Sequence, residues 1–261
     1  MVAIVTGGSS GIGLCAAKKL TEFGCTVYEF SRREFFCEGI VHMSVDVSKE
    51  KAVSEAVAEI IALEGKIDIV INCAGYGILG AAEFTLLEDA KRQLDVNFFG
   101  MVNVNKAVIP YMRRAGGGRI VNISSVAAVT AIPFQAYYSA SKAAINSYTC
   151  ALANEVYPYG ISVTAVMPGD IKTGFTSSRK KSWAGDSEYG GRISRSVAVM
   201  EHDEENGMSP EKAGGFIAKI ALKKIVKPLY TIGFSYRCVI LLTKILPCAL
   251  LNCIIRKIYA K

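Results

Sequence analysis

A glycine-rich turn follows a short apolar run at the start of the chain. Residues 2–5 are apolar, the turn reads Thr6-Gly7-Gly8-Ser9-Ser10-Gly11-Ile12-Gly13, and a helix-like stretch over residues 14–23 ends before Gly24. Strand, glycine turn and helix in this order can bring a pyrophosphate to a helix N-terminus, because glycine lets the backbone approach the phosphates and the helix dipole favours their charge. The plain alternative is a tight turn in an α/β protein.

Apolar runs alternate with helical patterns along the rest of the chain. The candidate strands are residues 2–6, 26–30, 41–45, 67–72, 119–124, 162–166 and 229–232, and the main candidate helices are 50–63, 86–114, 138–157 and 210–224. Apolar strands alternating with helices predict an α/β fold with a parallel sheet covered on both faces. Residues 174–208 form the least regular stretch, and long loops of this kind are often lids over a site.

Length and composition agree with one large globular domain. The chain has 261 residues, of which 51% are apolar and 20% charged, so it is not a disordered chain. The cysteines at 15, 25, 37, 73, 150, 238, 248 and 253 are scattered, and their spacing with the two histidines fits no metal site. We therefore expect no metal, no signal peptide before the first strand, and reduced core cysteines in a cytoplasmic protein.

Tyr138 and Lys142 are four residues apart in a predicted helix, so they lie one turn apart on the same face. There the ammonium can lower the pKa of the phenol, which is about 10 in free tyrosine. A tyrosine tuned in this way can exchange a proton near neutral pH. The pattern is common by chance, and it gains weight from the glycine turn and from Ser125, thirteen residues before Tyr138. Tyr137 lacks the spacing to Lys142 and is interpreted as a structural or substrate-facing neighbour.

These motifs, together with Asp46, Asn72-Cys73-Ala74-Gly75, Asn97, Pro168-Gly169 and Thr173, resemble those of the short-chain dehydrogenase/reductase family, which includes hydroxysteroid and retinol dehydrogenases. The resemblance covers roughly residues 2–235. It implies a single-domain, Rossmann-type, doubly wound parallel sheet of about seven strands with helices on both faces. We assign residues 1–233 to this NADP-binding domain and residues 234–261 to a C-terminal extension.

The resemblance implies a role for each catalytic residue. Tyr138 would give its proton to a substrate carbonyl, or take one in the oxidative direction, and Ser125 would bind the same oxygen and stabilise its developing charge. Lys142 would lower the pKa of Tyr138 and bind the nicotinamide ribose. Asn97 would hold a water between Lys142 and solvent, and it could also satisfy a helix kink.

The resemblance also implies a cofactor site. Asp46 would accept a hydrogen bond from the adenine amino group, or cap the helix that begins near Ser48. Thr173 would meet the carboxamide, or make a local turn bond. Cys73 replaces the commoner asparagine of this motif. The expected cofactor-binding residues are Gly7, Ser9, Ser10, Gly11, Ile12, Gly13, Ser31, Arg32, Arg33, Asp46, Val47, Asn72, Ala74, Gly75, Tyr138, Lys142, Pro168, Gly169, Ile171 and Thr173.

The end of the second strand indicates which nicotinamide cofactor binds. A carboxylate there binds the ribose 2′-hydroxyl of NAD, whereas arginine suits the 2′-phosphate of NADP. Ser31 takes the usual acidic position, Arg32 and Arg33 follow, and Glu29 comes two residues too early. We therefore expect NADP(H), the alternative being that the arginines form a solvated turn.

The C-terminal segment is basic and apolar. Residues 209–261 contain ten Lys or Arg and one acid, Glu211, a net +9 in a chain of net +7, so residues 1–208 carry −2. The longest uncharged run, residues 245–255, is too short to span a bilayer. We predict two amphipathic helical pieces joined at Pro247, with Arg237, Lys244 and Arg256 in a basic stripe.

Three interpretations of this tail remain open. It can bind anionic lipid at a membrane surface, close over an apolar substrate pocket, or pack against its own domain or another subunit. The chain is accordingly expected to be cytoplasmic or peripherally membrane-bound, and a homo-oligomer, either dimer or tetramer.

We expect an NADP(H)-dependent oxidoreductase that interconverts a secondary alcohol and a ketone on a lipophilic, hydroxysteroid-like substrate. The alternative is a 3-oxoacyl thioester reductase, which would share every motif. A non-catalytic scaffold is disfavoured because Ser125, Tyr138, Lys142 and Asn97 are all present. Nucleic-acid binding is disfavoured because the positive charge lies on an apolar tail.

Overall fold

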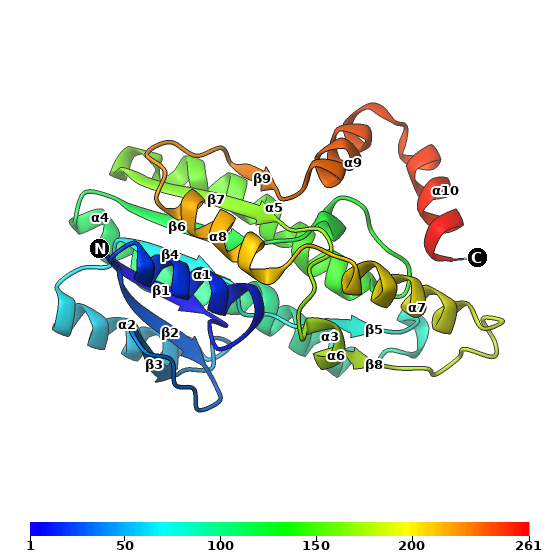
Figure 1. Cartoon of the computed structure of the whole chain (residues 1–261), viewed down its shortest axis with the longest axis horizontal. Coiled ribbons are helices and arrows are strands. Elements are labelled where there is room, and N and C mark those ends of the chain that lie inside the picture. Colours follow the sequence, from blue (N-terminus) through cyan, green and yellow to red (C-terminus); the bar gives the residue numbers. More distant parts are fainter. Residues whose placement is uncertain (261) are drawn as a thin grey trace.

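A parallel sheet of seven strands forms the centre of the molecule (Figure 1). The computed structural model describes residues 1–260, without the side chains of residues 176 and 177, so Lys261 of the predicted extension lies outside the described residues. The strand order is β3-β2-β1-β4-β6-β7-β9. The strands are β1 (Val2–Thr6), β2 (Thr26–Ser31), β3 (Ile40–Ser44), β4 (Ile69–Asn72), β6 (Gly118–Ile123), β7 (Ile161–Met167) and β9 (Leu229–Thr231). The predicted doubly wound α/β fold is confirmed, and the strand order reverses between β1 and β4, where such sheets bind ligands.

Helices bury both faces of the sheet. On one face, α1 (Gly11–Glu22) and α8 (Pro210–Ala221) share a core with Ala3 and Val5. On the other, α2 (Glu50–Glu64), α4 (Gly100–Arg114) and α5 (Ala136–Val156) share a core with Val2 and Ile4. Successive residues of β1 therefore enter opposite cores, which is why this strand is apolar at every position instead of alternating.

The helix that follows the glycine turn is fixed by close packing. A Cβ added at Gly214 of α8 would lie 2.6 Å from the backbone nitrogen of Ala16 in α1. The two helices can approach this closely only because residue 214 has no side chain. The N-terminus of α1, which begins within the glycine turn, therefore has a fixed position at the end of β1.

Two segments differ from the sequence-based predictions. The single helix expected over residues 86–114 is α3 (Leu87–Leu94), a π-helical turn (Asp95–Phe99) and α4. The stretch expected to be irregular contains α6 (Phe175–Ser178), α7 (Arg192–Glu205) and β8 (Lys180–Lys181), which pairs with β5 (Ile78–Leu79). The prediction was wrong for α7, which buries Ile193, Val197 and Met200 in a third cluster.

The predicted pair of C-terminal helices is present. These are α9 (Phe234–Ile245) and α10 (Cys248–Tyr259), which meet at Pro247. Figure 1 shows α9 leading away from β9 and α10 returning toward the body of the molecule. We call residues 234–260 the C-terminal arm. Its α9 packs chiefly on β9 and its α10 chiefly on α7. Among the described residues, none of the helices is both long and apolar enough to cross a membrane.

All eight cysteines, which lie within residues 1–260, are free thiols. The expectation that they belong to the core holds for Cys25, which is buried, and fails for Cys238 and Cys248, which are exposed on the arm. The arm packs through part of its surface only, so apolar residue types there do not imply burial.

Candidate active site

A large cleft of about 1580 Å³ lies at the carboxyl ends of the strands. It brings together most of the residues that the sequence identified, from segments far apart in the chain. The predicted residues that line it are Gly7, Ser9, Ser10, Gly11, Ile12, Gly13, Ser31, Arg32, Arg33, Asp46, Val47, Ala74, Gly75, Ser125, Tyr138, Lys142, Pro168, Gly169, Ile171 and Thr173. Asn72 and Asn97 lie outside it.

The glycine turn forms a backbone cradle at one end of the cleft. Gly7 has φ +65°, and a Cβ added there would lie 2.9 Å from Cα of Ala74. The hydroxyl oxygen of Thr6 accepts hydrogen bonds from the backbone nitrogens of Cys73 and Ala74, at 3.1 and 3.0 Å. Backbone, not side chains, therefore forms this surface, and it fits a nucleotide pyrophosphate at the N-terminus of α1.

The end of β2 presents two cations to the same cleft. Arg32 and Arg33 are exposed there, and the described residues include no ion-pair partner for either. The nearby Glu29 is fully buried. Its Oε2 accepts a hydrogen bond from the Ser31 hydroxyl at 3.2 Å and lies 2.7 Å from Nδ1 of His42. At this strand end Arg32 and Arg33 line the cleft, whereas the exposed Glu34 does not.

Ser125, Tyr138 and Lys142 meet where β6 and α5 converge. Ser125 lies two residues beyond the end of β6, and its hydroxyl oxygen accepts a hydrogen bond from the backbone nitrogen of Ala127 at 3.1 Å. The Lys142 ammonium lies 5.7 Å from the centroid of the Tyr138 ring and donates to the carbonyl of Ile123 at 2.8 Å. The predicted four-residue spacing therefore does place both side chains on one face of α5.

Burial dominates the proton affinities of this pair. It raises the pKa of Tyr138, against the opposing charge of Arg179 and a hydrogen bond with Ser125. Burial also lowers the pKa of Lys142 to about 8. The expectation that Lys142 leaves Tyr138 with a lowered pKa is therefore not met in this structure, because desolvation of the phenolate outweighs the nearby positive charges.

The two asparagines outside the cleft support its wall. Oδ1 of Asn97 accepts from the backbone nitrogen of Tyr76 at 2.9 Å, and its Nδ2 donates to the carbonyl of Tyr76 at 2.9 Å and to Ser141 at 3.2 Å. Asn97 lies in the π-helical turn, but these bonds connect it to Tyr76 and α5, so the expected role of satisfying a helix kink is not what the contacts show. Nδ2 of Asn72 donates to Asn105 and Asn122, at 2.8 and 2.9 Å. It joins neighbouring elements behind the cofactor site.

Thr173 shows the local bond that its alternative interpretation expected, whereas Asp46 bonds to Ser48 and does not cap the following helix. Oδ1 of Asp46 accepts from the backbone nitrogen and hydroxyl of Ser48, at 3.0 and 2.7 Å. The helix itself begins later, with Lys49 as its N-cap residue. Oγ1 of Thr173 accepts from the backbone nitrogen of Phe175 at 3.2 Å. Both side chains also line the cleft, so a cofactor role for each stays a prediction.

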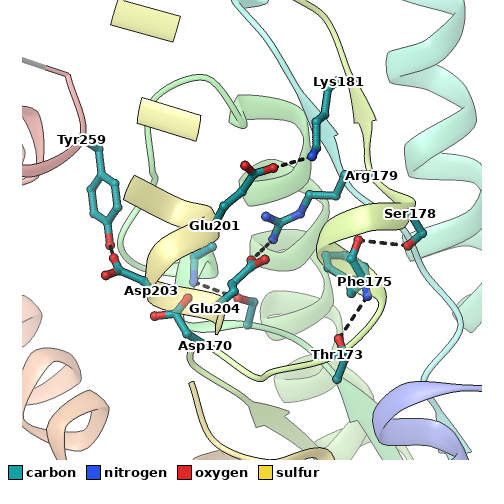
Figure 2. Close-up of polar contacts among 12 residues, drawn as sticks. Asp170, Thr173, Phe175, Ser178, Arg179, Lys181, Glu201, Asp203, Glu204 and Tyr259 are labelled. Carbon is teal, nitrogen blue, oxygen red and sulfur yellow. Dashed lines mark hydrogen bonds and ion pairs between the residues drawn. The ribbon is translucent and has the colours of Figure 1, made fainter. Parts of the chain in front are cut away.

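Sequence reasoning missed a buried ion pair beside Tyr138. Figure 2 shows Arg179 directed toward Glu204 of α7, to which it is both ion-paired and hydrogen-bonded. The guanidinium lies 4.9 Å from the centroid of the Phe175 ring, whose centroid lies 5.9 Å from that of Tyr138. Residues 179 and 204 are far apart in the chain, so no local spacing could have indicated the pair.

The C-terminal arm roofs the other end of the cleft. Tyr236 donates a hydrogen bond to Asp170, and Tyr259 donates one to Asp203 at 3.4 Å (Figure 2 shows the second). The Tyr236 ring lies directly against Gly169, where a Cβ would overlap it. The apolar side chains that the arm contributes to the lining are Val239, Leu242, Leu246, Leu251, Ile254, Ile255 and Ile258. One end of the cleft is thus polar backbone and the other is apolar.

Comparison with known proteins identifies the family of the chain and agrees with its fold. The family model described as "short chain dehydrogenase" matches residues 1–183. A 3-ketodihydrosphingosine reductase of Bacteroides thetaiotaomicron is 46% identical over 226 residues, which cover 85% of this chain and 84% of that protein. The probable short-chain type dehydrogenase/reductase VdlC of Helicobacter pylori is 31% identical, covering 94% of this chain and 93% of that protein. The crystal structure of a short-chain dehydrogenase from Streptomyces avermitilis matches with a TM-score of 0.82 and 26% identity, covering 93% and 94% of the two chains.

Proposed function

The chain belongs to the short-chain dehydrogenase/reductase family, and we propose that it reduces the ketone of a long-chain lipid with NADPH, Tyr138 supplying the proton. The observation that carries this proposal is the composition of the cleft. Ser125, Tyr138 and Lys142 lie between a glycine cradle and an apolar roof, so a nucleotide and an aliphatic chain can meet at one hydroxyl.

The residues at the polar end fit a phosphorylated dinucleotide. The cradle of Gly7, Gly11 and Gly13 would hold the pyrophosphate, and Arg32 and Arg33 would bind a 2′-phosphate. When bound, NADPH supplies the hydride that reduces the carbonyl carbon. Lys142, with its ammonium beside the phenol ring, would bind the ribose and keep positive charge near the developing oxyanion.

Tyr138 is suited to act as the acid in the reductive direction. Because burial raises its pKa, the phenol keeps its proton at neutral pH. Ser125 would donate a hydrogen bond to the carbonyl oxygen while Tyr138 transfers its proton to that oxygen. The charge of Arg179 favours the phenolate left behind, so this buried cation would ease the transfer.

The apolar roof narrows the substrate class. Val239 and Leu242 of α9, Leu246 just after it, and Leu251, Ile254 and Ile258 of α10 line the cleft, which gives a long aliphatic lining. The sequence suggested a hydroxysteroid-like substrate, but the Bacteroides relative is named for a linear amino ketone. We therefore favour 3-ketodihydrosphingosine or a similar long-chain ketone.

NADPH oxidation with a substrate panel tests the proposal. The panel is 3-ketodihydrosphingosine, a ketosteroid and acetoacetyl coenzyme A, with Tyr138→Phe as the test variant and Tyr137→Phe as its matched control. Tyr137 does not line the cleft, and its hydroxyl contacts the carbonyl of Ala82. We expect turnover of the sphingoid ketone, loss of about 10²–10⁴ in kcat for Tyr138→Phe with NADPH affinity kept, and no loss for Tyr137→Phe. Preference for the steroid or the thioester, or full activity of Tyr138→Phe, would contradict the proposal.

A further inference from the structure

The C-terminal arm is an arch with two anchored ends and an exposed apex. At one end, Tyr236 is hydrogen-bonded to Asp170. At the other, Tyr259 is hydrogen-bonded to Asp203, and Nε of Arg192 donates to the carbonyl of Ala260 at 3.0 Å. Figure 1 shows the chain turning between α9 and α10 at the point farthest from these anchors. The arm therefore projects from the body without losing its position over the cleft.

The apex is apolar and exposed. Residues 245–250 carry no charge, and Ile245 and Leu250 are 67% and 48% exposed. Phe234, at the start of α9, is 82% exposed. None of these three side chains lines the cleft. Ile245 and Leu250 give the apex an outer apolar surface, separate from the inner one that lines the cleft, and exposed apolar surface of this kind typically marks an interaction site.

The positive charge of the arm indicates which kind of partner suits its exposed apolar surface. Residues 234–260 contain Arg237, Lys244, Arg256 and Lys257, all exposed, and no acid. A second copy of the chain docked through the same face would bring these cations together, which is repulsive. An anionic bilayer attracts the cations and takes up the apolar apex at once. Each helix has 12 residues, so the pair suits the bilayer interface and not a crossing.

We propose that the C-terminal arm docks on an anionic membrane with Ile245 and Leu250 of the apex inserted, so that a long-chain ketone enters the cleft from the bilayer between α9 and α10. This inference rests on the proposed function for the identity of the substrate. The same two helices line the cleft with their inner side chains and meet the membrane with their outer ones. The aliphatic chain thus stays in an apolar environment from bilayer to active site, which avoids the cost of exposing it to water.

Vesicle co-sedimentation of the full chain tests the docking. The probes are phosphatidylcholine vesicles and the same vesicles with added phosphatidylglycerol, each at low and high salt. We expect binding to the anionic vesicles that weakens with salt. Neutralising Lys244→Gln and Lys257→Gln together is expected to lower the partition coefficient roughly 30-fold, at about a factor of five for each cation. Equal binding to both vesicle types, or none to either, would overturn the proposal.

An apex variant and a matched control separate docking from folding. Ile245→Ser with Leu250→Ser should abolish sedimentation while NADPH binding and turnover of a short water-soluble ketone stay as in the wild type. The control is Leu63→Ser with Leu86→Ser, which changes two equally exposed leucines, 67% and 66% exposed, elsewhere on the body. It should sediment like the wild type. The inference would be refuted if the apex variant sedimented with vesicles as the wild type does. It would also be refuted if the apex mediated dimerisation of a protein that does not bind vesicles.

The substrate assay distinguishes the two proposals. With 3-ketodihydrosphingosine delivered in anionic vesicles, the apex variant should lose at least tenfold in kcat/KM, and delivery in detergent should restore it. Failure of the wild type on this ketone in detergent would refute the proposed function alone. Undiminished activity of the apex variant on vesicle-borne ketone would refute the route through the arm alone.

Discussion

At the residue scale, the charges at the end of β2 bear on whether the site prefers NADPH or NADH. Arg32 and Arg33 are exposed in the cleft, while Glu29, the acid of β2, is buried and hydrogen-bonded to Ser31 and His42. An arginine–phosphate hydrogen bond contributes about 1.5–3 kcal/mol. The site should therefore prefer NADPH to NADH by roughly 10–100-fold in kcat/KM.

Replacing both arginines, Arg32→Ala with Arg33→Ala, should remove this preference while leaving the kcat/KM for NADH nearly unchanged. Arg113→Ala with Arg114→Ala is the matched control, because that exposed pair lies at the end of α4, away from the cleft. Steady-state kinetics with both cofactors provide the measurement. A wild type with equal efficiency for both, or a control pair that behaves like the test pair, would disprove the assignment.

Also at the residue scale, Lys142 should destabilise the cofactor-free fold. Its pKa falls from an ordinary 10.5 to about 8, because the charged form is buried. Between these pH values the unfolded chain binds more protons than the folded one, so stability rises with pH across that window. Below pH 8 the buried charge costs up to about 3 kcal/mol.

Lys142→Met should therefore raise the free energy of unfolding at pH 7 by up to about 3 kcal/mol, and the gain should shrink toward zero near pH 10.5. The same variant should lose activity, as expected where a functional group is held at the expense of stability. Urea denaturation at both pH values measures the effect, with the exposed Lys18→Met as control. A gain that does not depend on pH would show that the buried charge is not its cause.

At the element scale, Gly8 of the glycine turn packs closely against β2. A Cβ added at Gly8 would lie 2.6 Å from Cγ of Glu29 and 3.3 Å from the carbonyl of Val5. Gly8→Ala should therefore destabilise the fold by about 1–3 kcal/mol through overpacking. In Glu29→Ala the Cγ is absent, so the combined variant should be more stable than the sum of the two single changes predicts. Denaturant unfolding of all four proteins measures this coupling, and strict additivity would contradict the contact.

Elements with a local signature were predictable, and elements defined by distant partners were not. The strands of the main sheet were found because each is an apolar run bounded by turns, and Tyr138 and Lys142 because their spacing matches the helix period. Helix α7 was missed because its sequence is mostly polar and charged, like that of a loop. Its helical character depends on Ile193, Val197 and Met200, which are buried in a cluster with residues distant in the chain. Arg179 is held by Glu204, Phe175 and Gly77, which are distant from it or carry no local signal in the sequence.

At the scale of the whole molecule, the arm should be dispensable for folding and needed for lipid substrates. The main sheet ends at β9, and within the arm only Ile255 and Ala260 are buried. A chain ending at Gly233 should therefore remain folded and bind NADPH. If removal of the arm exposes two methylenes of the bound substrate, the binding free energy weakens by about 1.6 kcal/mol. The KM for a long-chain ketone should then rise roughly tenfold or more.

A short water-soluble ketone is the control substrate for this truncation, because it does not reach the roof. Its kinetics should be the same with and without the arm. An unchanged KM for the long-chain ketone would show that the arm packs against the body without serving the substrate. A chain that fails to fold without residues 234–261 would show instead that these residues belong to the domain itself.

Because Tyr236 packs on Gly169, the loop after β7 and the C-terminal arm should move together. With NADPH and the membrane placed as proposed, residues 168–173 of that loop would hold one ligand, while Tyr236 and its hydrogen bond to Asp170 connect the same loop to the C-terminal arm. Thermodynamic linkage requires that such coupling act equally in both directions. Whatever factor vesicles impose on the dissociation constant of NADPH, NADPH must impose on the affinity for vesicles. The concentration of NADPH in the cell and the fraction of the protein bound to membranes would then depend on each other.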